Sequence, residues 1–392
     1  MAPPRTLVIV LAGGAGSRLE LLTKHRAKPA MRFAGTHRLV DFPLSNARNA
    51  GIDDVWVVQQ FHPTSLNVHL ANGRPWDLDR TRGGLLVLEP YQGDEREGWH
   101  AGTADALWRF APAIEGFGAD AVVVVSADAI YRLDYAAVVD EHLASDAEVT
   151  MVTVQHDGDN TRYGVVETKD GRITGYQLKP DEPATDIVTT EVFVFDPQAL
   201  VAGLETVAEQ GEDALTDLGE ALLPLFVERG TAHDYRHTGY WQDVGTVAAY
   251  WRTNVAFARA DAPFDVDDEA WPISTRGARR GGARVSGGGE VESSLLGPGA
   301  RIEGRVRGSV IGPGVHIHAG AEVVDSVIID GAVVGAGARV VRAIVDERAR
   351  IGDGVTVGVG AEGRDDDEAI TLVGAAAEVD GDLSAGARHP EQ

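Results

Sequence analysis

The feature that most constrains the fold is a repeat near the C-terminal end of the chain. Between residues 295 and 356 the sequence includes LLGPGA, SVIGPG, VHIHAG, VIIDGA, VVGAGA and IGDGVT. An aliphatic residue recurs every five to seven positions, and IGPG, VGAG and IGDG serve as turn signatures. Repeats of this kind form parallel β-helices, in which each triangular turn stacks on its neighbour. We therefore expect residues 286–392 to form a β-helix that ends in a polar tail.

The preceding part of the chain alternates apolar strands with helical patterns. TLVIVLAGG, DVWVVQQF, AVVVVSAD, EVTMVTVQ and TTEVFVFD are rich in strand-forming residues, and helical stretches such as TADALWRFAPAIEGF lie between them. This order predicts a parallel sheet covered on both faces. RYGVVETKDGRITGYQLKP alternates around a KDG turn and predicts a hairpin. The Pro-, Gly- and charge-rich residues 262–285 predict a linker after a domain of residues 1–261.

Composition excludes several classes of function. The chain has 35 basic and 60 acidic residues, a net charge of −25, which argues against a nucleic-acid surface. It has no cysteine, so disulfides and thiolate metal sites are excluded, and a cytoplasmic location is compatible. No run of about 18 apolar residues occurs, so we expect no membrane span.

A glycine-rich segment follows the first predicted strand. LAGGAGSRL, residues 11 to 19, could close its backbone amides around phosphate, and a helix start after it would add its dipole. The segment lacks the Gly-Lys-Ser/Thr of a Walker loop, and its spacing departs from the dinucleotide fingerprint. On these residues alone, a tight strand-to-helix turn stays open as the alternative.

Further motifs follow in a fixed order. After LAGGAGSRL come AKPA, RLVDFPLSNARNAGI, AGTADAL and YWQDVGTVAAYW. With these motifs the chain resembles the sugar-1-phosphate nucleotidyltransferases and, among them, the glucose-1-phosphate adenylyltransferase family. The resemblance covers nearly the whole chain. It implies an α/β fold with a Rossmann-like nucleotidyltransferase catalytic domain (1–261), a linker (262–285) and a C-terminal left-handed parallel β-helix (286–392).

The resemblance also implies a reaction. A phosphate oxygen of a sugar 1-phosphate would attack the α-phosphorus of a nucleoside triphosphate, and pyrophosphate would leave. Arg18 in GSRL and Lys28 in AKPA match the family's cations beside the phosphates. Asp128 and Asp243 match the two aspartates that hold magnesium, a hard ion suited to carboxylates. For Asp243, an N-cap of the following helix is the alternative interpretation, and Asp134 fits such a cap or turn.

Other site residues follow from the same resemblance. The chain contains only four lysines, and two of them, Lys28 and Lys179, fall at motif positions. The expected sugar-phosphate-binding residues are Tyr163, Gly164 and Lys179. The expected nucleotide-binding residues are Leu11, Ala12, Gly13, Gly14, Gln92, Gly102 and Thr103. The expected partners are ATP and glucose 1-phosphate, and the family implies a cytoplasmic homo-oligomer, a tetramer by analogy, in glycogen synthesis.

Several positions depart from the family pattern around the sugar. Leu178 precedes Lys179 where glutamate is usual, and Glu191 replaces a glycine. Glu220 ends a motif that usually ends in lysine, and Ala127 and Ala129 flank Asp128 in place of glycine and histidine. These changes keep two alternatives open. The chain could be a weakly active or inactive regulatory paralogue, or it could use a different sugar 1-phosphate.

The effector site of the family also looks altered. His25 stands where the family has a lysine, and the acidic run RDDDEA, residues 364 to 369, would repel a sugar bisphosphate. We expect fructose 1,6-bisphosphate to activate weakly or not at all, which a titration of turnover checks.

The repeat domain offers a third hypothesis. Hexapeptide β-helices also carry acyltransferases and carbonic anhydrases with histidine-bound metal. VHIHAG places His316 and His318 on one face of a strand, as two metal ligands would be. A third histidine with suitable spacing is missing from the repeats, which favours structural histidines.

Overall fold

The computed structural model describes residues 3–14, 16–92, 98–364 and 366–391. The described residues divide into two compact units. The first comprises Met1–Gly14, Val40–Trp241 and Glu269–Ser274, and the second comprises Ala15–Leu39, Gln242–Asp268 and Thr275–Gln392. Residues of the predicted catalytic domain therefore occur in both units, and the predicted boundaries at residues 261 and 285 stay a prediction.

The first unit is built on a mixed sheet. Within the described residues, nine strands pair in the order β5-β4-β1-β6-β11-β8-β12-β10-β9. The strands are β1 (Thr6–Ala12), β4 (Asp54–Gln59), β5 (Gly84–Leu88), β6 (Ala121–Ser126), β8 (Val149–Gln155), β9 (Gly164–Lys169), β10 (Arg172–Leu178), β11 (Ile187–Phe195) and β12 (Ala232–Arg236). β1, β4, β5 and β6 run parallel, as predicted, and β9 and β10 form the predicted hairpin.

The prediction of a wholly parallel sheet is wrong at β11. This strand pairs antiparallel with both β6 and β8. Between β8 and β11 the chain forms the β9–β10 hairpin and no helix. Because parallel neighbours need a long crossover, usually helical, a strand that returns from a hairpin runs antiparallel instead.

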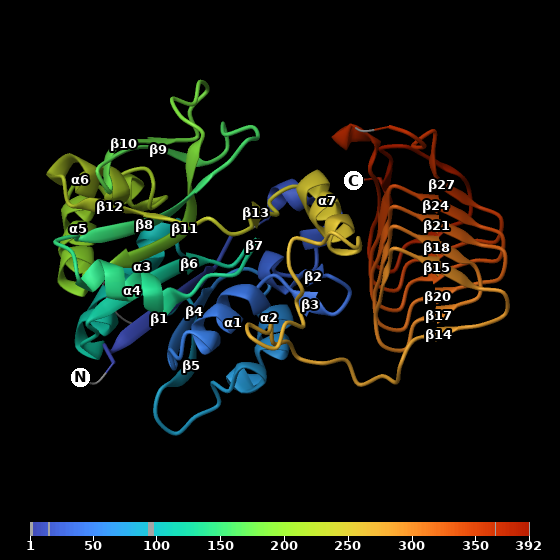
Figure 1. Cartoon of the computed structure of the whole chain (residues 1–392), viewed down its shortest axis with the longest axis horizontal. Helices are drawn as coiled ribbons and strands as arrows, with labels where there is room; N and C mark the ends of the chain where they lie inside the picture. Colours follow the sequence, from blue (N-terminus) through green and yellow to red (C-terminus); the bar gives the residue numbers. More distant parts are fainter. Residues whose placement is uncertain (1–2, 15, 93–97, 365, 392) are drawn as a thin grey trace. The chain divides into compact units, whose positions relative to one another are not determined.

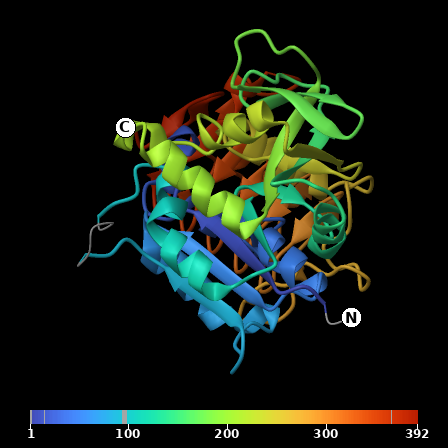
Figure 2. The ribbon, with the colours of Figure 1, turned by 90° about the vertical axis from the view of Figure 1, so that its left-hand side faces the viewer.

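Helices cover both faces of this sheet (Figure 1). They are α1 (Asp41–Asn49), α2 (Pro63–Leu70), α3 (Thr103–Phe117), α4 (Tyr135–Leu143), α5 (Pro197–Ala208) and α6 (Leu222–Arg229), with the 3₁₀ helices η3 (Ala71–Trp76) and η4 (Glu212–Leu215). Leu7 and Ile9 of β1 share one apolar cluster with α3, α5 and α6, and α5 lies across that face in Figure 2. Val8 and Val10 point to the other face and are also fully buried. Buried on both faces, the strand is a continuous apolar run.

The second unit contains the predicted β-helix. In the described part of the chain, its strands form three parallel six-stranded sheets, and Figure 1 shows the stacked coils. The first sheet contains β14 (Arg284–Val285), β17 (Arg301–Ile302), β20 (His316–Ile317), β23 (Val333–Val334), β26 (Arg350–Ile351) and β29 (Glu378–Val379). The second contains β15 (Glu290–Glu292), β18 (Arg305–Arg307), β21 (Glu322–Val324), β24 (Arg339–Val341), β27 (Thr356–Val359) and β30 (Leu383–Ser384). The third contains β16 (Leu295–Leu296), β19 (Val310–Ile311), β22 (Val327–Ile328), β25 (Ala343–Val345), β28 (Thr371–Val373) and β31 (Arg388–His389).

Aliphatic residues of the repeat fill the interior of the coils. Ile302, Ile317 and Val334 follow one another in register on β17, β20 and β23, and each is fully buried. The coils continue as far as β31 (Arg388–His389), so the residues expected as a polar tail are part of the β-helix. The α/β unit and the β-helix confirm the predicted fold class.

Shorter elements complete the second unit. They are η1 (Ser17–Thr23), η2 (Lys28–Ala30), β2 (Arg32–Phe33), β3 (His37–Arg38), α7 (Val247–Phe257) and η5 (Asp367–Ala369). Two other short strands are β7 (Ala129–Tyr131), which follows Asp128 in the first unit, and β13 (Trp241–Asp243), which lies within the YWQDVGT motif. Among the described residues, every helix is too short or too polar to span a lipid bilayer.

Candidate active site

The glycine-rich segment begins where β1 ends. Leu11 pairs with Ser126 at the end of β6, and Ala12 pairs with Gln59 at the end of β4. The segment thus lies at the carboxyl edge of three parallel strands, where α/β folds bind their ligands. This edge carries four predicted nucleotide-binding residues, Leu11, Ala12, Gly13 and Gly14.

Asp128 follows at the same edge. It lies two residues beyond the end of β6, and the hydroxyl of Ser126 donates a hydrogen bond to its carboxylate. Its neighbours Ala127 and Ala129 are buried, whereas Asp128 itself is only partly buried. Burying the small neighbours fixes the backbone, so the central strand presents this predicted metal ligand from the first unit.

Gln60 joins two of the predicted loops, and the sequence analysis did not identify it. Its side chain accepts a hydrogen bond from the backbone N–H of His100 (2.6 Å) and donates one to the carbonyl of His100 (3.1 Å). A Cβ on Gly13 would lie 3.8 Å from Cβ of Gln60. The glycine segment and the loop that starts at His100 are therefore held side by side. The only sequence signal is the position of Gln60 directly after β4.

A cavity of about 310 Å³ lies next to this loop. Gln92, the residue predicted to contact the base edge, lines it together with Gln59, Gln60, Tyr91 and Trp99. Amide side chains offer both donors and acceptors, and the rings of Tyr91 and Trp99 offer apolar faces. This combination suits a planar, polar-edged group such as a nucleotide base.

The loop AGTADA is fixed by close backbone contacts. A Cβ on Gly102 would lie 1.8 Å from the carbonyl oxygen of Thr216, so only glycine fits there. The hydroxyl of Thr103 accepts a hydrogen bond from the N–H of Leu218 (3.0 Å), and the N–H of Ala101 donates to Asp105 (2.7 Å). Gly102 and Thr103 therefore set the position of the N-terminus of α3, whose dipole favours a nearby anion.

The three residues predicted to bind the sugar phosphate lie together in the first unit. The N–H of Lys179 donates to the carbonyl of Tyr163 (2.8 Å), and Gly164 pairs with Leu178 across the β9–β10 hairpin. The side chain of Lys179 is 53% exposed, and its Nζ lies 3.6 Å from Oδ2 of Asp217. The hairpin thus presents a solvent-accessible ammonium group beside Tyr163.

Two carboxylates act on Tyr176, a residue of the same hairpin. Burial raises the pKa of Tyr176, and the negative charges of Asp217 and Glu191 raise it further. Glu191 has φ of 59°, in the left-handed region that favours glycine, at a bulge of β11. The bulge explains why a glycine suits this position, and the glutamate here adds negative charge near the sugar-phosphate residues.

The cations predicted to act on the triphosphate lie in the second unit. Lys28 is 8% exposed in its side chain, and its Nζ lies 3.7 Å from Oδ1 of Asp243. A Cβ on Gly245 would lie 2.8 Å from Oδ2 of Asp243 and 3.2 Å from Nη2 of Arg18. Arg18, Lys28 and Asp243 are thus brought together around a residue that has no side chain. Gly245 stands in the quoted DVGT motif, but the sequence analysis gave it no role.

The N-cap alternative for Asp243 is wrong. Thr246 caps α7, because its hydroxyl accepts a hydrogen bond from the N–H of Ala249 (3.1 Å). Asp243 instead accepts from the N–H of Gly245 (3.1 Å) in a local turn. By contrast Asp134 is the cap it was expected to be, since it accepts from the N–H groups of Ala136 and Ala137. The carboxylate of Asp243 therefore belongs to this turn and not to the cap of α7.

A buried ion pair fixes the segment that carries Lys28. Arg26, two residues earlier, donates two hydrogen bonds to the carboxylate of Asp346 at 2.8 and 3.0 Å, and the side chains are 9% and 0% exposed. Burial raises the pKa of Asp346, and the Arg26 guanidinium opposes that shift. Within the second unit, this pair attaches the AKPA segment to the β-helix.

Comparisons with known proteins agree with this arrangement. A family model described as "Nucleotidyl transferase" matches residues 7–260, and one described as "GlmU-like, C-terminal hexapeptide" matches residues 281–374. The glucose-1-phosphate adenylyltransferase of Acetivibrio thermocellus is 34% identical over 325 residues, which cover 82% of this chain and 76% of the relative. Those of Fervidobacterium nodosum and Bacillus cytotoxicus are 36% and 34% identical and are covered over 77% and 86% of their lengths. The chain belongs to the glucose-1-phosphate adenylyltransferase family.

The structure shows the surroundings of the residues that depart from the family pattern. Leu178 packs against Gly219, where a Cβ would lie 2.9 Å from its Cδ1. Glu220 is exposed and accepts a hydrogen bond from the hydroxyl of Thr216. Where the family pattern has a lysine, this chain therefore has a carboxylate three residues after Asp217. The altered positions gather in the first unit, beside the sugar-phosphate residues, whereas Arg18, Lys28 and Asp243 retain the family pattern.

Proposed function

We propose that this chain transfers the adenylyl group of ATP to glucose 1-phosphate, giving ADP-glucose and pyrophosphate. The observation that carries the proposal is the group of Arg18, Lys28 and Asp243 around Gly245, in a chain whose relatives are named for this reaction. Two cations and a carboxylate at one place are what a triphosphate and its counter-ion require. This group is the part of the site that the departures leave intact.

The reaction is an in-line displacement. A phosphate oxygen of glucose 1-phosphate forms a bond to the α-phosphorus of ATP, and the bond from that phosphorus to the bridging oxygen of the β-phosphate breaks. The electron pair of the broken bond leaves with pyrophosphate. Arg18 and Lys28 would balance the charge that develops on the phosphate oxygens, and Lys179 would hold the attacking sugar phosphate. The cavity beside Gln92 would hold the base.

Asp128 and Asp243 are the residues that would hold magnesium. The donor set fits that ion, because both residues are carboxylates and neither is fully buried. When bound, magnesium supplies positive charge to the triphosphate. Asp128 follows β6 by two residues, and Asp243 is the last residue of β13.

The proposal also includes the oligomeric state, location and regulation of the protein. By family analogy it works as a cytoplasmic homotetramer in glycogen synthesis, and light scattering of the purified chain tests the tetramer. The expected weak response to fructose 1,6-bisphosphate rests partly on the run RDDDEA, of which Asp365 lies outside the described residues. Asp366 pairs with Arg364, and Asp367 pairs with Arg252, so local cations partly neutralise these two carboxylates.

A second candidate function is a weakly active or regulatory subunit of such an enzyme, or an enzyme for another sugar 1-phosphate. The acidic neighbour of Lys179 favours it, because Asp217, whose carboxylate lies 3.6 Å from Nζ, would weaken the binding of an anionic sugar phosphate. Leu178 adds to this, since a leucine cannot accept a hydrogen bond from a sugar hydroxyl.

One experiment separates the candidates. The purified chain is assayed for magnesium-dependent pyrophosphate release with each nucleoside triphosphate against several hexose 1-phosphates. Adenylyl transfer predicts the highest kcat/KM for ATP with glucose 1-phosphate. A higher value for another pair would reassign the substrate, and no release with any pair would establish the regulatory interpretation.

A further inference from the structure

A cluster of three potential metal ligands lies on the first sheet of the β-helix. His316 begins β20, and His318 follows two positions later, while Ile317 between them is fully buried. Because side chains alternate along a strand, both imidazoles project from the same outer surface of the coil. The sequence analysis found no third histidine to join them.

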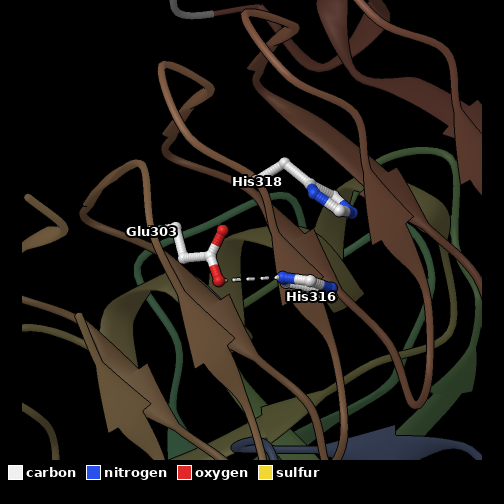
Figure 3. Close-up of side chains that lie close together, drawn as sticks. All are labelled: Glu303, His316 and His318. Atoms are coloured by element: carbon white, nitrogen blue, oxygen red, sulfur yellow. Dashed lines mark ion pairs between the residues drawn. The ribbon is translucent and has the colours of Figure 1, made fainter. Parts of the chain in front are cut away.

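The stacking of the coils supplies a third donor. Arg301 and Ile302 of β17 pair with His316 and Ile317 of β20, so Glu303 lies next to His318 in the same register. The N–H of Glu303 donates to the carbonyl of Ile317 (2.9 Å), which fixes that register. Figure 3 shows the carboxylate of Glu303 directed toward the ring of His316. A carboxylate thus occupies the place where a third histidine was sought.

The distances within the cluster suit a shared ion. Oxygen and nitrogen ligand atoms of Glu303, His316 and His318 all lie within 4.8 Å of one another. Nε2 of His316 lies 3.5 Å from Oε1 of Glu303. Ligand atoms about 2.1 Å from a tetrahedral zinc ion are about 3.4 Å apart. The Glu303–His316 pair already has this spacing, and rotation about the side-chain torsions of His318 can supply the remaining approach.

Nε2 of His316 is buried and makes no hydrogen bond within the described residues. Its neighbour at 3.5 Å, Oε1 of Glu303, lies at ion-pair distance and not in a hydrogen bond. Folded proteins rarely leave a buried polar atom without a hydrogen bond, and a shared metal ion would satisfy this nitrogen. The rings of His316 and His318 stack with their centroids 3.8 Å apart and their planes at 29°. Each imidazole has a ring nitrogen whose lone pair can bind a metal ion, so two adjacent rings can both contribute to one site.

The chemistry of the donors selects the ion. Two imidazoles and one carboxylate form the ligand set of borderline divalent metals such as zinc, whereas magnesium and calcium prefer oxygen ligands alone. We propose that Glu303, His316 and His318 form a binding site for a divalent ion of the zinc class that joins two successive coils of the β-helix. The site goes beyond the proposed adenylyl transfer and uses none of its residues.

Equilibrium dialysis of the full chain against zinc tests the site. We expect one tightly bound zinc per chain, and excess magnesium should not displace it. His318→Ala and Glu303→Gln should each weaken binding by more than about 100-fold, because losing even an outer partner of a ligand costs about 10- to 100-fold. Cobalt in place of zinc should give the visible absorption of a tetrahedral site in the parent chain and not in either variant.

Two matched variants separate this site from non-specific binding. Glu290→Gln removes a glutamate that pairs with Arg305 on the second sheet, and His62→Asn removes an exposed histidine of the first unit. His62 has φ of 47°, a conformation that asparagine tolerates. Both controls should bind zinc as the parent does. Absence of a zinc equivalent in the parent, or retention of it in both His318→Ala and Glu303→Gln, would overturn the proposal.

Thermal unfolding gives an independent readout. An ion that binds only the folded coils raises the Tm of the protein as the ion concentration rises. Zinc should therefore raise the Tm of the parent and of both controls, and it should leave the Tm of His318→Ala unchanged. If His318→Ala fails to fold, Glu303→Gln carries the same comparison, because glutamine keeps the size of the side chain while removing the charge. An equal zinc-dependent rise in all variants would contradict a bridge between coils.

Discussion

The two motif lysines occupy contrasting surroundings. Lys28 is 8% exposed and lies 3.7 Å from Asp243, whereas Lys179 is 53% exposed and lies 3.6 Å from Asp217. The two ion pairs have nearly equal distances but differ in the strength of their Coulomb attraction, because water screens the exposed pair far more than the buried one. The buried lysine is the one proposed to act on the triphosphate, with Arg18 and Asp243, which keep the family pattern. The exposed lysine is the one proposed to hold the sugar phosphate, where the sequence departs from that pattern.

The sharpest test of the proposed metal site is Asp128→Asn. Asparagine keeps the shape of the side chain but loses the charge that would hold a divalent cation, so we expect turnover to fall by at least about 1,000-fold. Magnesium-dependent pyrophosphate release measures it.

Asp134→Asn is the matched control for this variant. Asp134 caps α4 and has no assigned role in the reaction, and asparagine caps helices about as well as aspartate does. Turnover should therefore match that of the parent. Full activity in Asp128→Asn would refute the metal assignment.

The second largest effect concerns the stability of the Lys28 segment. Arg26→Ala leaves the fully buried carboxylate of Asp346 without its partner, which should lower the free energy of unfolding by about 3–5 kcal/mol. Denaturant unfolding followed by circular dichroism measures the change. Arg252→Ala is the control in the same unit, since its pair with Asp367 is 62% and 52% exposed and should contribute less than about 1 kcal/mol. Equal losses in the two variants would contradict the contrast between buried and exposed pairs.

The sequence predicted local structure well and distant pairing poorly, and Arg26 shows why. The strands, the hairpin and the hexapeptide coils follow from periodicities of a few residues, which the chain carries locally. The pair of Arg26 with Asp346 joins residues that are 320 positions apart, and no local sequence pattern predicts it. The direction of β11 was missed for a related reason, since it depends on the connection before the strand and not on the residues within it.

Acid should weaken the first unit through His142. Burial lowers the pKa of this side chain to about 4, and its Nδ1 lies 2.9 Å from the hydroxyl of Thr150. The folded state therefore favours the neutral ring, and the unfolded state takes up the proton first as pH falls. The neutral ring contributes about 3 kcal/mol to the free energy of unfolding. This contribution is complete above pH 6.5 and is lost as pH falls from 6.5 to about 4. Unfolding in urea at a series of pH values checks this.

His142→Gln is the comparison for the pH series. Glutamine does not titrate, so the variant should be less stable than the parent near pH 7 but should lose less stability between pH 6.5 and 4. Parallel pH curves for the two proteins would show that another group carries the acid sensitivity.

Removing each motif lysine tests the opening contrast directly. Lys28→Met should lower kcat by about 100-fold, because the charge acts on phosphate oxygens in a partly desolvated place. Lys179→Met should raise KM for the sugar phosphate by about tenfold, because its exposed charge contributes less. Steady-state kinetics with each substrate varied gives both values. A larger loss of kcat in Lys179→Met than in Lys28→Met would reverse the assignment of the two sides.

Residues of the candidate site could be proposed from the sequence where they stand in a recognisable motif. Asp128, Lys28 and Lys179 stand in quoted motifs. Asp128 follows the predicted strand β6, and Lys179 follows the second strand of the predicted hairpin, while their roles stay predictions. Gln60 was missed because its role depends on the backbone of His100, which only the folded loop brings near. Glu303 was missed for a different reason. It precedes His318 by one coil of the repeat, so aligning the coils for carboxylates as well as histidines would have found it.

The smallest expected effect restores a family residue on the sugar side. Glu220→Lys replaces an exposed carboxylate with the cation that the family pattern has there, three residues after Asp217. Coulomb attraction at an exposed position amounts to about 0.2–1 kcal/mol, so kcat/KM for the sugar phosphate should rise by about two- to fivefold. Glu209→Lys, an exposed glutamate at the end of α5, has the same change of net charge and should leave kcat/KM unchanged. Because raising the salt concentration screens exposed charges, the gain should shrink at high ionic strength. A gain that persists in high salt would mean that residue 220 contacts the substrate directly, and the contrast between a buried triphosphate side and a screened sugar side would then no longer hold.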